Sequence, residues 1–344
     1  MRAAIFNPYL DTLGGGERYT AVFAKVLAKN GYTVDVEWKD VGIIKNLENR
    51  FGTDLDGVNI VNDIKKGEGY DLCFWVSDGS IPMLHARNNI LHFQVPFHNV
   101  SGRSLLNKMK LFRINKIVCN SLFTKKVIDS EYGVNSLILY PPIDTSVVKP
   151  KRKENLILSV GRFSQILQTK GQDILIKAFR KMVDEGLTDW KLILVGGVEV
   201  GAKDYVEKLR ILSTGYPIEI IESPNFKTLK EIYGKSKIFW SASGFGENEE
   251  KNPQKVEHFG ITVVEAMAWG VPPVVYAAGG HKEIIEEEKN GQLWKKIGEL
   301  TKKTMNLIEN PKTLREMASD AKKSSEKYSE YNFEKNIVTN LIHK

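Results

Sequence analysis

The sequence has little cysteine and no long apolar run. Only Cys73 and Cys119 occur among 344 residues, and both stand in apolar surroundings. Two scattered cysteines exclude a disulfide-stapled scaffold and a cysteine-based zinc site. No stretch reaches the roughly 18 consecutive apolar residues of a membrane-spanning helix. The first residues, MRAAIFNPYL, lack the basic and then apolar pattern of a secretory signal, so we expect a cytoplasmic protein.

Two common metal-binding signatures are also missing, because the sequence has neither an HExxH motif nor a Cys/His quartet. We therefore expect no metal site and no bound cofactor. Lysine and arginine number 49 against 42 acidic residues, which gives a net charge of +7. This excess fits an anionic partner such as a nucleotide, a phospholipid surface or nucleic acid, or else a solvated basic surface.

Short apolar segments alternate with helical patterns along the chain. Such alternation predicts parallel sheets covered by helices on both faces. The polar, proline-bearing segment 149–153 interrupts the alternation and predicts a linker between two doubly wound α/β domains. The expected strands are 3–6, 32–36, 72–76, 90–93, 117–119 and 137–140 in the first half, and 155–160, 190–195, 218–221, 238–241 and 273–276 in the second.

Two loops contain groups that suit phosphate. The cluster Gly14-Gly15-Gly16 lies between an expected strand and an expected helix, where amides and the helix dipole favour an anion. It has no P-loop lysine, so a tight turn remains the alternative. In the second half, Gly161-Arg162-Phe163 and Lys170 follow the strand at 155–160. A guanidinium and an ammonium at that strand end suit a diphosphate, or are two surface cations.

The segment EHFGITVVEAM, residues 257–267, places two carboxylates in mostly apolar surroundings. Gly260 and the amides after it open an expected helix and suit a phosphate. A glutamate inside an apolar helix is costly unless it has a partner. The two hydroxyl groups of a ribose would satisfy Glu265, and a neighbouring basic side chain is the alternative.

Taken together, these motifs resemble the retaining glycosyltransferases of family 4, which have the GT-B fold. The resemblance rests on the two glutamates separated by seven residues, on the Arg162–Lys170 loop and on the glycine cluster. It implies two Rossmann-like domains that face each other across a cleft. Residues 1–148 would form the acceptor-side domain and 149–326 the nucleotide-sugar-binding domain, with 327–344 as a helix that crosses back to the first domain.

The resemblance also implies a role for each motif residue. Arg162 and Lys170 would hold the donor diphosphate, Glu265 the ribose and Glu257 the transferred sugar, while His92 would lie near the reacting sugar. The lengthened loop 164–169 departs from the family pattern around Lys170. Nucleotide-sugar contacts would also come from Gly15, Gly16, Gly161, Phe259, Gly260, Ile261 and Thr262.

The finer resemblance is to the mannosyltransferases of lipid-linked oligosaccharide assembly. It implies GDP-mannose as the first expected donor and a UDP-sugar as the second. The acceptor would be a glycan, lipid-linked or small-molecule hydroxyl. Transfer would proceed with retention, without a covalent intermediate on a side chain and without a metal, and no nucleic-acid partner is expected.

Two other functions remain open from the residues alone. Asp35 and Glu37 end a strand about 20 residues after the glycine cluster, as in a nicotinamide-dependent Rossmann enzyme. That alternative leaves the 257–265 segment unexplained. A non-catalytic module for nucleic acid or sugar nucleotide is the second alternative, although basic and aromatic residues do not gather in one segment as single-strand binding requires.

Two amphipathic segments lie outside these motifs. Residues 103–116 interleave basic and apolar side chains, so they either contact an anionic membrane at its inner face or pack as a core-facing helix with a solvated basic face. We favour the core-facing helix, and a lipid-linked acceptor would reverse that preference. Near the C-terminus, Tyr331, Ile337, Val338 and Leu341 are expected to be buried against the first domain.

Overall fold

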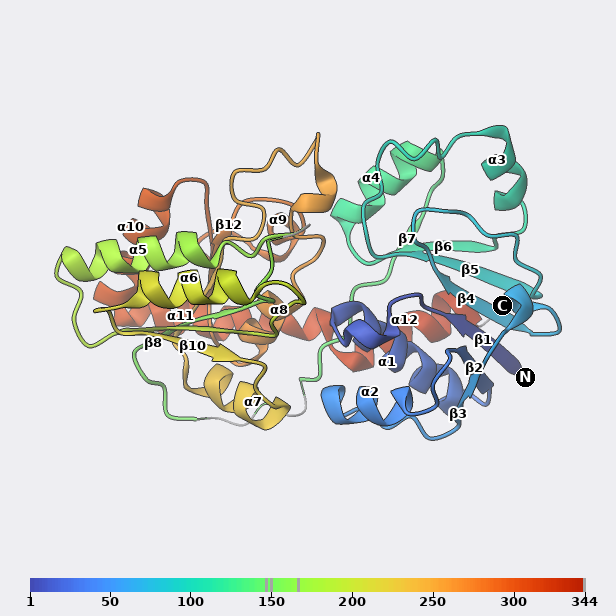
Figure 1. Cartoon of the computed structure of the whole chain (residues 1–344), viewed down its shortest axis with the longest axis horizontal. Helices are drawn as coiled ribbons and strands as arrows, with labels where there is room; N and C mark the ends of the chain where they lie inside the picture. Colours follow the sequence, from blue (N-terminus) through green and yellow to red (C-terminus); the bar gives the residue numbers. More distant parts are fainter. Residues whose placement is uncertain (146–147, 149–150, 166–167, 343–344) are drawn as a thin grey trace. The chain divides into compact units, whose positions relative to one another are not determined.

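The computed structural model describes residues 1–145, 148, 151–165 and 168–342, and it contains two compact units (Figure 1). Unit 1 comprises Met1–Pro142 and Tyr328–Lys344, and unit 2 comprises Ile143–Lys327. The division lies a few residues before the expected boundary at 148. The linker predicted at 149–153 and the loop extension predicted at 164–169 both fall partly outside the described residues.

Unit 1 is built on a seven-stranded sheet in the order β3-β2-β1-β4-β5-β6-β7, with parallel pairing throughout. Helices cover both faces of this sheet (Figure 1). The strands are β1 (Arg2–Phe6), β2 (Thr33–Glu37), β3 (Val58–Val61), β4 (Leu72–Val76), β5 (Asn88–Phe93), β6 (Lys116–Cys119) and β7 (Leu137–Ile138). The helices are α1 (Gly15–Lys29), α2 (Ile43–Phe51), α3 (Leu105–Leu111), α4 (Leu122–Tyr132) and α12 (Glu330–Ile337).

Unit 2 repeats this architecture on a six-stranded parallel sheet in the order β10-β9-β8-β11-β12-β13. Its core contains the fully buried Phe179, Trp240 and Trp294. The strands are β8 (Leu156–Val160), β9 (Lys191–Gly196), β10 (Ile218–Glu222), β11 (Ile238–Ser241), β12 (Pro273–Tyr276) and β13 (Gln292–Trp294). The helices are α5 (Gln172–Asp184), α6 (Lys203–Ser213), α7 (Phe226–Lys235), α8 (Ile261–Ala268), α9 (His281–Ile284), α10 (Ile297–Glu309) and α11 (Pro311–Ser325).

The two sheets confirm the predicted fold class and add strands that the sequence did not indicate. β3 and β13 are edge strands of four and three residues, too short to show a periodic pattern. In unit 2, β8 lies between β9 and β11, so the chain runs outward from β8 in two directions. Open α/β sheets bind ligands at the carboxyl ends of strands where the order reverses in this way.

The preference for a core-facing helix within 103–116 is wrong. α3 has no buried residue, and its large apolar side chains are largely exposed to solvent. Apolar contacts with the rest of unit 1 are made at the two ends of the helix, by Val100 before it, by Leu111 as its last residue and by Ile114 after it. Among the described residues, no helix combines the length and the apolar character that crossing a bilayer requires.

The C-terminal segment packs on α1 of unit 1 (Figure 1). Phe333, Ile337 and Leu341 are buried, and Phe333 meets the ring of Tyr19 edge to face at 4.9 Å. The side chain of Tyr331, which was expected to be buried, is 72% exposed. Helix α12 begins after the Ser329 cap, and Phe333 and Ile337 lie four residues apart on one of its faces. Tyr331 lies two residues before Phe333 and therefore belongs to a different face.

Phe333→Ala should lower the free energy of unfolding by about 3–5 kcal/mol, because it removes a buried ring from a packed site. Tyr331→Ala is the matched control on the exposed face and should change it by less than about 0.5 kcal/mol. Urea unfolding monitored by circular dichroism measures both. Equal losses for the two variants would contradict the packing of this helix.

Candidate functional site

An ion pair between Lys170 and Glu257 lies at the centre of the predicted unit 2 motifs. The Lys170 ammonium donates to Glu257 Oε2 at 2.8 Å and to Gln168 Oε1 at 2.8 Å. Its contact with Ser243 Oγ is longer, at 3.4 Å. Lys170 precedes α5, and Ser243 follows β11, so the cation lies at the carboxyl end of the central strands. The structure thus brings together two residues that lie 87 positions apart in the sequence.

Glycines bring the backbone close to this ion pair. A Cβ atom on Gly161 would lie 2.8 Å from Cγ of Lys170, so a side chain there would displace the lysine stem. The carbonyl of Glu257 accepts a hydrogen bond from the amide of Gly280 at 2.8 Å. A Cβ on Gly279 would lie 2.0 Å from that same carbonyl oxygen. The glycines therefore permit the approach that fixes the two charged residues.

Electrostatics keep Glu257 ionised. Burial by itself would raise the pKa of this carboxyl, but the charge and hydrogen bond of Lys170 outweigh it and lower the pKa to about 2. Glu257 is therefore a charged hydrogen-bond acceptor throughout the physiological pH range. It has no proton to donate there.

His281 lies near this carboxylate, and sequence reasoning assigned it no role. The side chain is fully buried, and its Nδ1 lies 2.8 Å from the carbonyl oxygen of Tyr276. Burial lowers the pKa of His281, which keeps the ring neutral, so Nδ1 donates to that carbonyl and Nε2 carries no proton. Among the described residues, Nε2 has no hydrogen-bond partner. A glycine pair followed by a histidine, Gly279-Gly280-His281, was the available signal.

The second glutamate of the motif, Glu265, lies on α8. Tyr233 of α7 donates its hydroxyl proton to Glu265 Oε2 at 3.0 Å. The tyrosine is another residue that sequence reasoning missed. The start of α8 follows Phe259 and Gly260 and includes Ile261 and Thr262, whose amides belong to the first turn. Helix starts leave such amides without intrahelical partners, which suits an anion.

Arg162 follows β8 on the loop that also contains Gly161. Its side chain is exposed, and it forms no ion pair or hydrogen bond with a described residue. Gln172 holds the backbone of this loop by donating to the carbonyls of Gly161 and Arg162 at 3.3 Å and 3.0 Å. A fixed loop with an unpaired guanidinium provides a charge for an anionic ligand.

The remaining predicted site residues lie in unit 1. His92, on β5, is fully buried, and its ring stacks on Tyr19 at 4.3 Å. Burial lowers the pKa of His92 to about 3, so the ring is neutral. Gly15 and Gly16 begin α1, and a Cβ on Gly16 would lie 1.9 Å from Oε1 of Gln94. A side chain at position 16 would therefore displace the end of the Gln94 side chain.

The two acids of β2, Asp35 and Glu37, have structural partners. Asp35 accepts hydrogen bonds from Arg2 at 2.9 Å, from Tyr70 at 2.9 Å and from Asn59 at 3.1 Å. Glu37 accepts from the amide of Ile64 at 3.0 Å. These bonds occupy the carboxylates that a nicotinamide enzyme would use for ribose. The residues that suggested the nicotinamide alternative are thus explained by packing within unit 1.

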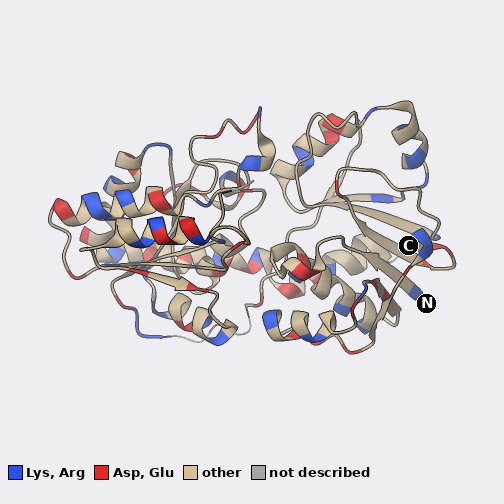
Figure 2. Ribbon diagram, in the orientation of Figure 1, with Lys and Arg blue, Asp and Glu red and all other residues tan. Residues whose placement is uncertain are grey.

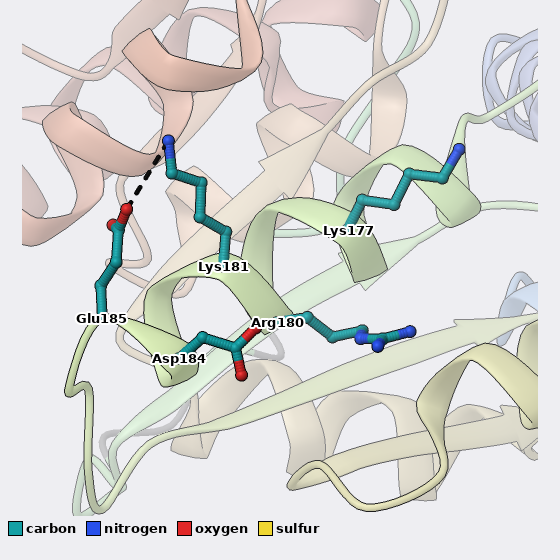
Figure 3. Close-up of a pocket in the computed structure, with 5 residues that line it drawn as sticks. All are labelled: Lys177, Arg180, Lys181, Asp184 and Glu185. Atoms are coloured by element: carbon teal, nitrogen blue, oxygen red, sulfur yellow. Dashed lines mark ion pairs between the residues drawn. The ribbon is translucent and has the colours of Figure 1, made fainter.

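A surface hollow on α5 contains none of the predicted site residues (Figure 3). Its lining mixes charges of both signs, and Lys181 pairs with Glu185 at 3.7 Å. The hollow is lined by Lys177, Arg180, Lys181, Asp184 and Glu185. Within the described residues, no group of three or more His, Cys, Asp or Glu side chains has the arrangement of a metal site.

A comparison with known protein families assigns unit 2 to one of them. The family model described as "Glycosyl transferases group 1" matches residues 143–324, which include Lys170, Glu257 and Glu265. The chain belongs to the group 1 glycosyltransferases. Two sheets of this topology are those of the GT-B fold. Arg162, Lys170, Glu257 and Glu265 lie in the matched region, whereas the glycine cluster and His92 lie outside it.

Curated relatives of this chain include proteins named as mannosyltransferases and uncharacterised glycosyltransferases. A GDP-Man:Man(3)GlcNAc(2)-PP-Dol alpha-1,2-mannosyltransferase of Dictyostelium discoideum is 32% identical over 216 residues, which cover 59% of this chain and 41% of that protein. The chain thus spans less than half the length of that relative. An uncharacterised glycosyltransferase of Haemophilus influenzae is 26% identical over 367 residues. The alignment covers 95% of this chain and 96% of that protein.

Solved structures share the fold of this glycosyltransferase over nearly its whole length. HepE of Anabaena, solved in complex with UDP, superposes with a TM-score of 0.77 and covers 99% of both chains. Sequence identity between the two is 20%. The likeness therefore concerns the architecture.

Lys170→Met should lower the free energy of unfolding at pH 7 by about 1–3 kcal/mol, because it leaves the Glu257 carboxylate unpaired. The low pKa of Glu257 contributes stability above the unfolded value of about 4.3, and this contribution is lost as pH falls through the folded value of about 2. In the variant, burial without the lysine raises the pKa of Glu257. The difference in the free energy of unfolding between wild type and Lys170→Met should therefore be largest at neutral pH and become smaller below about pH 4.

Urea unfolding at several pH values measures this difference. Lys177→Met is the matched control, because Lys177 pairs with Asp173 on the exposed face of α5 at 3.5 Å. Its effect should stay below about 1 kcal/mol and vary little with pH. If the difference in the free energy of unfolding between wild type and Lys170→Met became larger toward acid pH, this would contradict the pairing of Glu257 with Lys170.

Proposed function

We propose that this protein transfers a sugar from a nucleotide-sugar donor to a hydroxyl acceptor with retention of configuration, as a member of glycosyltransferase family 4. The observation that supports this most is the Lys170–Glu257 pair at the carboxyl ends of the central strands of unit 2. It combines a cation for a leaving diphosphate with an acceptor for sugar hydroxyls. Unit 2 is also the region that the family model matches.

Diphosphate binding would use Lys170, Arg162 and the start of α8. The ammonium donates to three side chains, and its 3.4 Å contact with Ser243 is the weakest of the three. A phosphate oxygen can replace Ser243 without breaking the pair with Glu257. The exposed Arg162 guanidinium adds a second cation, so both charges act on the diphosphate as it leaves.

Sugar binding would use the acceptor atoms around Glu257. The ionised carboxylate accepts hydroxyl protons, and the unprotonated Nε2 of His281 offers a further acceptor. Neither group supplies a proton at neutral pH. Because neither group protonates the departing diphosphate, its oxygen stays free to take the proton of the acceptor hydroxyl, as the resemblance implies, and no side chain becomes glycosylated.

The ribose of the donor would bind at Glu265. Tyr233 already donates to one carboxylate oxygen, and this hydrogen bond orients the group. A ribose diol supplies hydroxyl donors, which a carboxylate accepts. In unit 1, we propose that Gly15, Gly16 and the neutral His92 serve the acceptor side.

GDP-mannose is the first donor we propose, and a UDP-sugar is the second. The name of the Dictyostelium relative supports GDP-mannose and a lipid-linked acceptor for that protein. HepE supports the alternative, because its structure contains UDP. A glycan or a lipid-linked hydroxyl is the acceptor class that follows.

Glu257→Gln and Arg162→Ala should each reduce donor turnover at least about a hundredfold, because each removes a preorganised charge. Release of nucleoside diphosphate from GDP-mannose and UDP-glucose measures this, since slow hydrolysis needs no acceptor. Glu250→Gln is the control, an exposed acid in the loop before Glu257. A folded Glu257→Gln protein with wild-type turnover would refute the assignment.

Chelation by EDTA should leave turnover within about twofold of its starting value. Arg162 and Lys170 supply the positive charge that a divalent ion supplies in other transferases. The same release assay, with and without manganese, measures this. Loss of activity with EDTA and its recovery with manganese would show that the charge of the diphosphate is neutralised by a metal instead.

A further inference from the structure

The apolar face of α3 is exposed and lies on unit 1. Leu105, Leu106, Met109 and Phe112 are 76%, 60%, 57% and 91% exposed, respectively. Leu105, Met109 and Phe112 follow at intervals of four and three residues, so they share one helix face, and Leu106 is three residues before Met109. The other large exposed apolar side chains of the described residues are spread along the chain. Four such residues within one short helical segment mark an interaction surface.

The sequence segment that contains α3 is basic. Between Asp78 and Asp129 the sequence has eight lysine and arginine residues and no acidic residue. Lys108, Lys110 and Lys116 form no ion pair with a described residue. Figure 2 shows α3 with basic residues and no acidic residue. The full set is Arg87, Arg103, Lys108, Lys110, Arg113, Lys116, Lys125 and Lys126.

Both ends of the α3 segment are attached to unit 1. Glu131 of α4 accepts hydrogen bonds from the amides of Val100 at 3.0 Å and Gly102 at 3.2 Å. Arg103 donates to the carbonyl of Ser130 at 2.8 Å. After the helix, Arg113 donates to the carbonyl of Leu84 at 3.2 Å. The scaffold thus fixes the helix while its apolar side chains remain in solvent.

We propose that α3, its own lysines and the residues on either side of it, here called the α3 surface (residues 103–116), bind an anionic phospholipid membrane. The apolar side chains would enter the boundary between headgroups and acyl chains, and the lysines would contact the lipid phosphates. The positive charge disfavours a second copy of this chain as the partner, because a symmetric contact would bring two basic surfaces together. This inference does not depend on which donor unit 2 binds.

Co-sedimentation of the full chain with vesicles tests the α3 surface. The protein should pellet with vesicles of phosphatidylcholine mixed with phosphatidylglycerol, and much less with phosphatidylcholine alone. Raising the salt concentration should release it, because counter-ions screen the lysine–phosphate attraction. Absence of binding to the mixed vesicles at low salt would overturn the proposal.

Two double variants separate the apolar and the basic contributions. Leu106→Ser/Phe112→Ser should weaken binding to mixed vesicles at least about tenfold. Lys108→Gln/Lys110→Gln should weaken it by about fivefold for each lysine removed. The thermal unfolding temperature and donor hydrolysis without vesicles should be unchanged, because these side chains lie outside the buried core.

Matched controls come from unit 2. Val200→Ser/Ile211→Ser replaces apolar side chains that are 95% and 66% exposed, and Lys208→Gln/Lys302→Gln removes two exposed lysines. Both controls should bind mixed vesicles like the wild type. Equal weakening in controls and α3 variants would overturn the proposal. It would also be overturned if the wild type is an oligomer in sedimentation velocity and the α3 variants are monomers that retain vesicle binding.

Discussion

The contact between Lys170 and Glu257 is the constraint on which the candidate site depends. Each charge is largely removed from water, and either one alone would be costly to bury. Their 2.8 Å hydrogen bond fixes the ammonium at the end of the central strands and lowers the pKa of the carboxyl. Other features of unit 2 accommodate this pair. Gly161 leaves room for the lysine stem, and Gly280 holds the Glu257 backbone.

Sheet topology explains why distant segments meet at this pair. Because β8 lies between β9 and β11, the loops after β8 and β11 emerge at the same edge of the sheet. The first of these loops leads to Arg162 and the second to Ser243. Glu257 precedes α8, which begins four residues further along the chain at Ile261. One sheet edge thus gathers two cations, a fixed carboxylate and a helix start, and together these suit a nucleotide diphosphate linked to a sugar.

Much of this arrangement could be predicted from the sequence, because it is encoded in local patterns. Alternating apolar segments indicated the two sheets, and the motif around Glu257 and Glu265 indicated the family. The roles of His281 and Tyr233 were not predicted, because a single histidine or tyrosine gives no periodic pattern. The role of such a residue depends on its tertiary contacts. The burial of Phe333 in place of Tyr331 depended on where α12 begins, which hydrophobicity alone does not determine. The exposure of α3 was not predicted for a related reason. An amphipathic pattern shows that a helix has an apolar face, but it does not specify what that face contacts.

Calorimetric titration with nucleotides tests the central claim most directly, because it measures the diphosphate contribution without a sugar, an acceptor or turnover. GDP and UDP would be compared with guanosine and uridine, on wild type and on Arg162→Ala. The account predicts that at least one diphosphate binds at least about tenfold more tightly than its nucleoside, and that Arg162→Ala removes most of this advantage. Nucleosides that bind as tightly as their diphosphates, or an advantage that is unchanged in Arg162→Ala, would contradict a diphosphate site at this edge of unit 2.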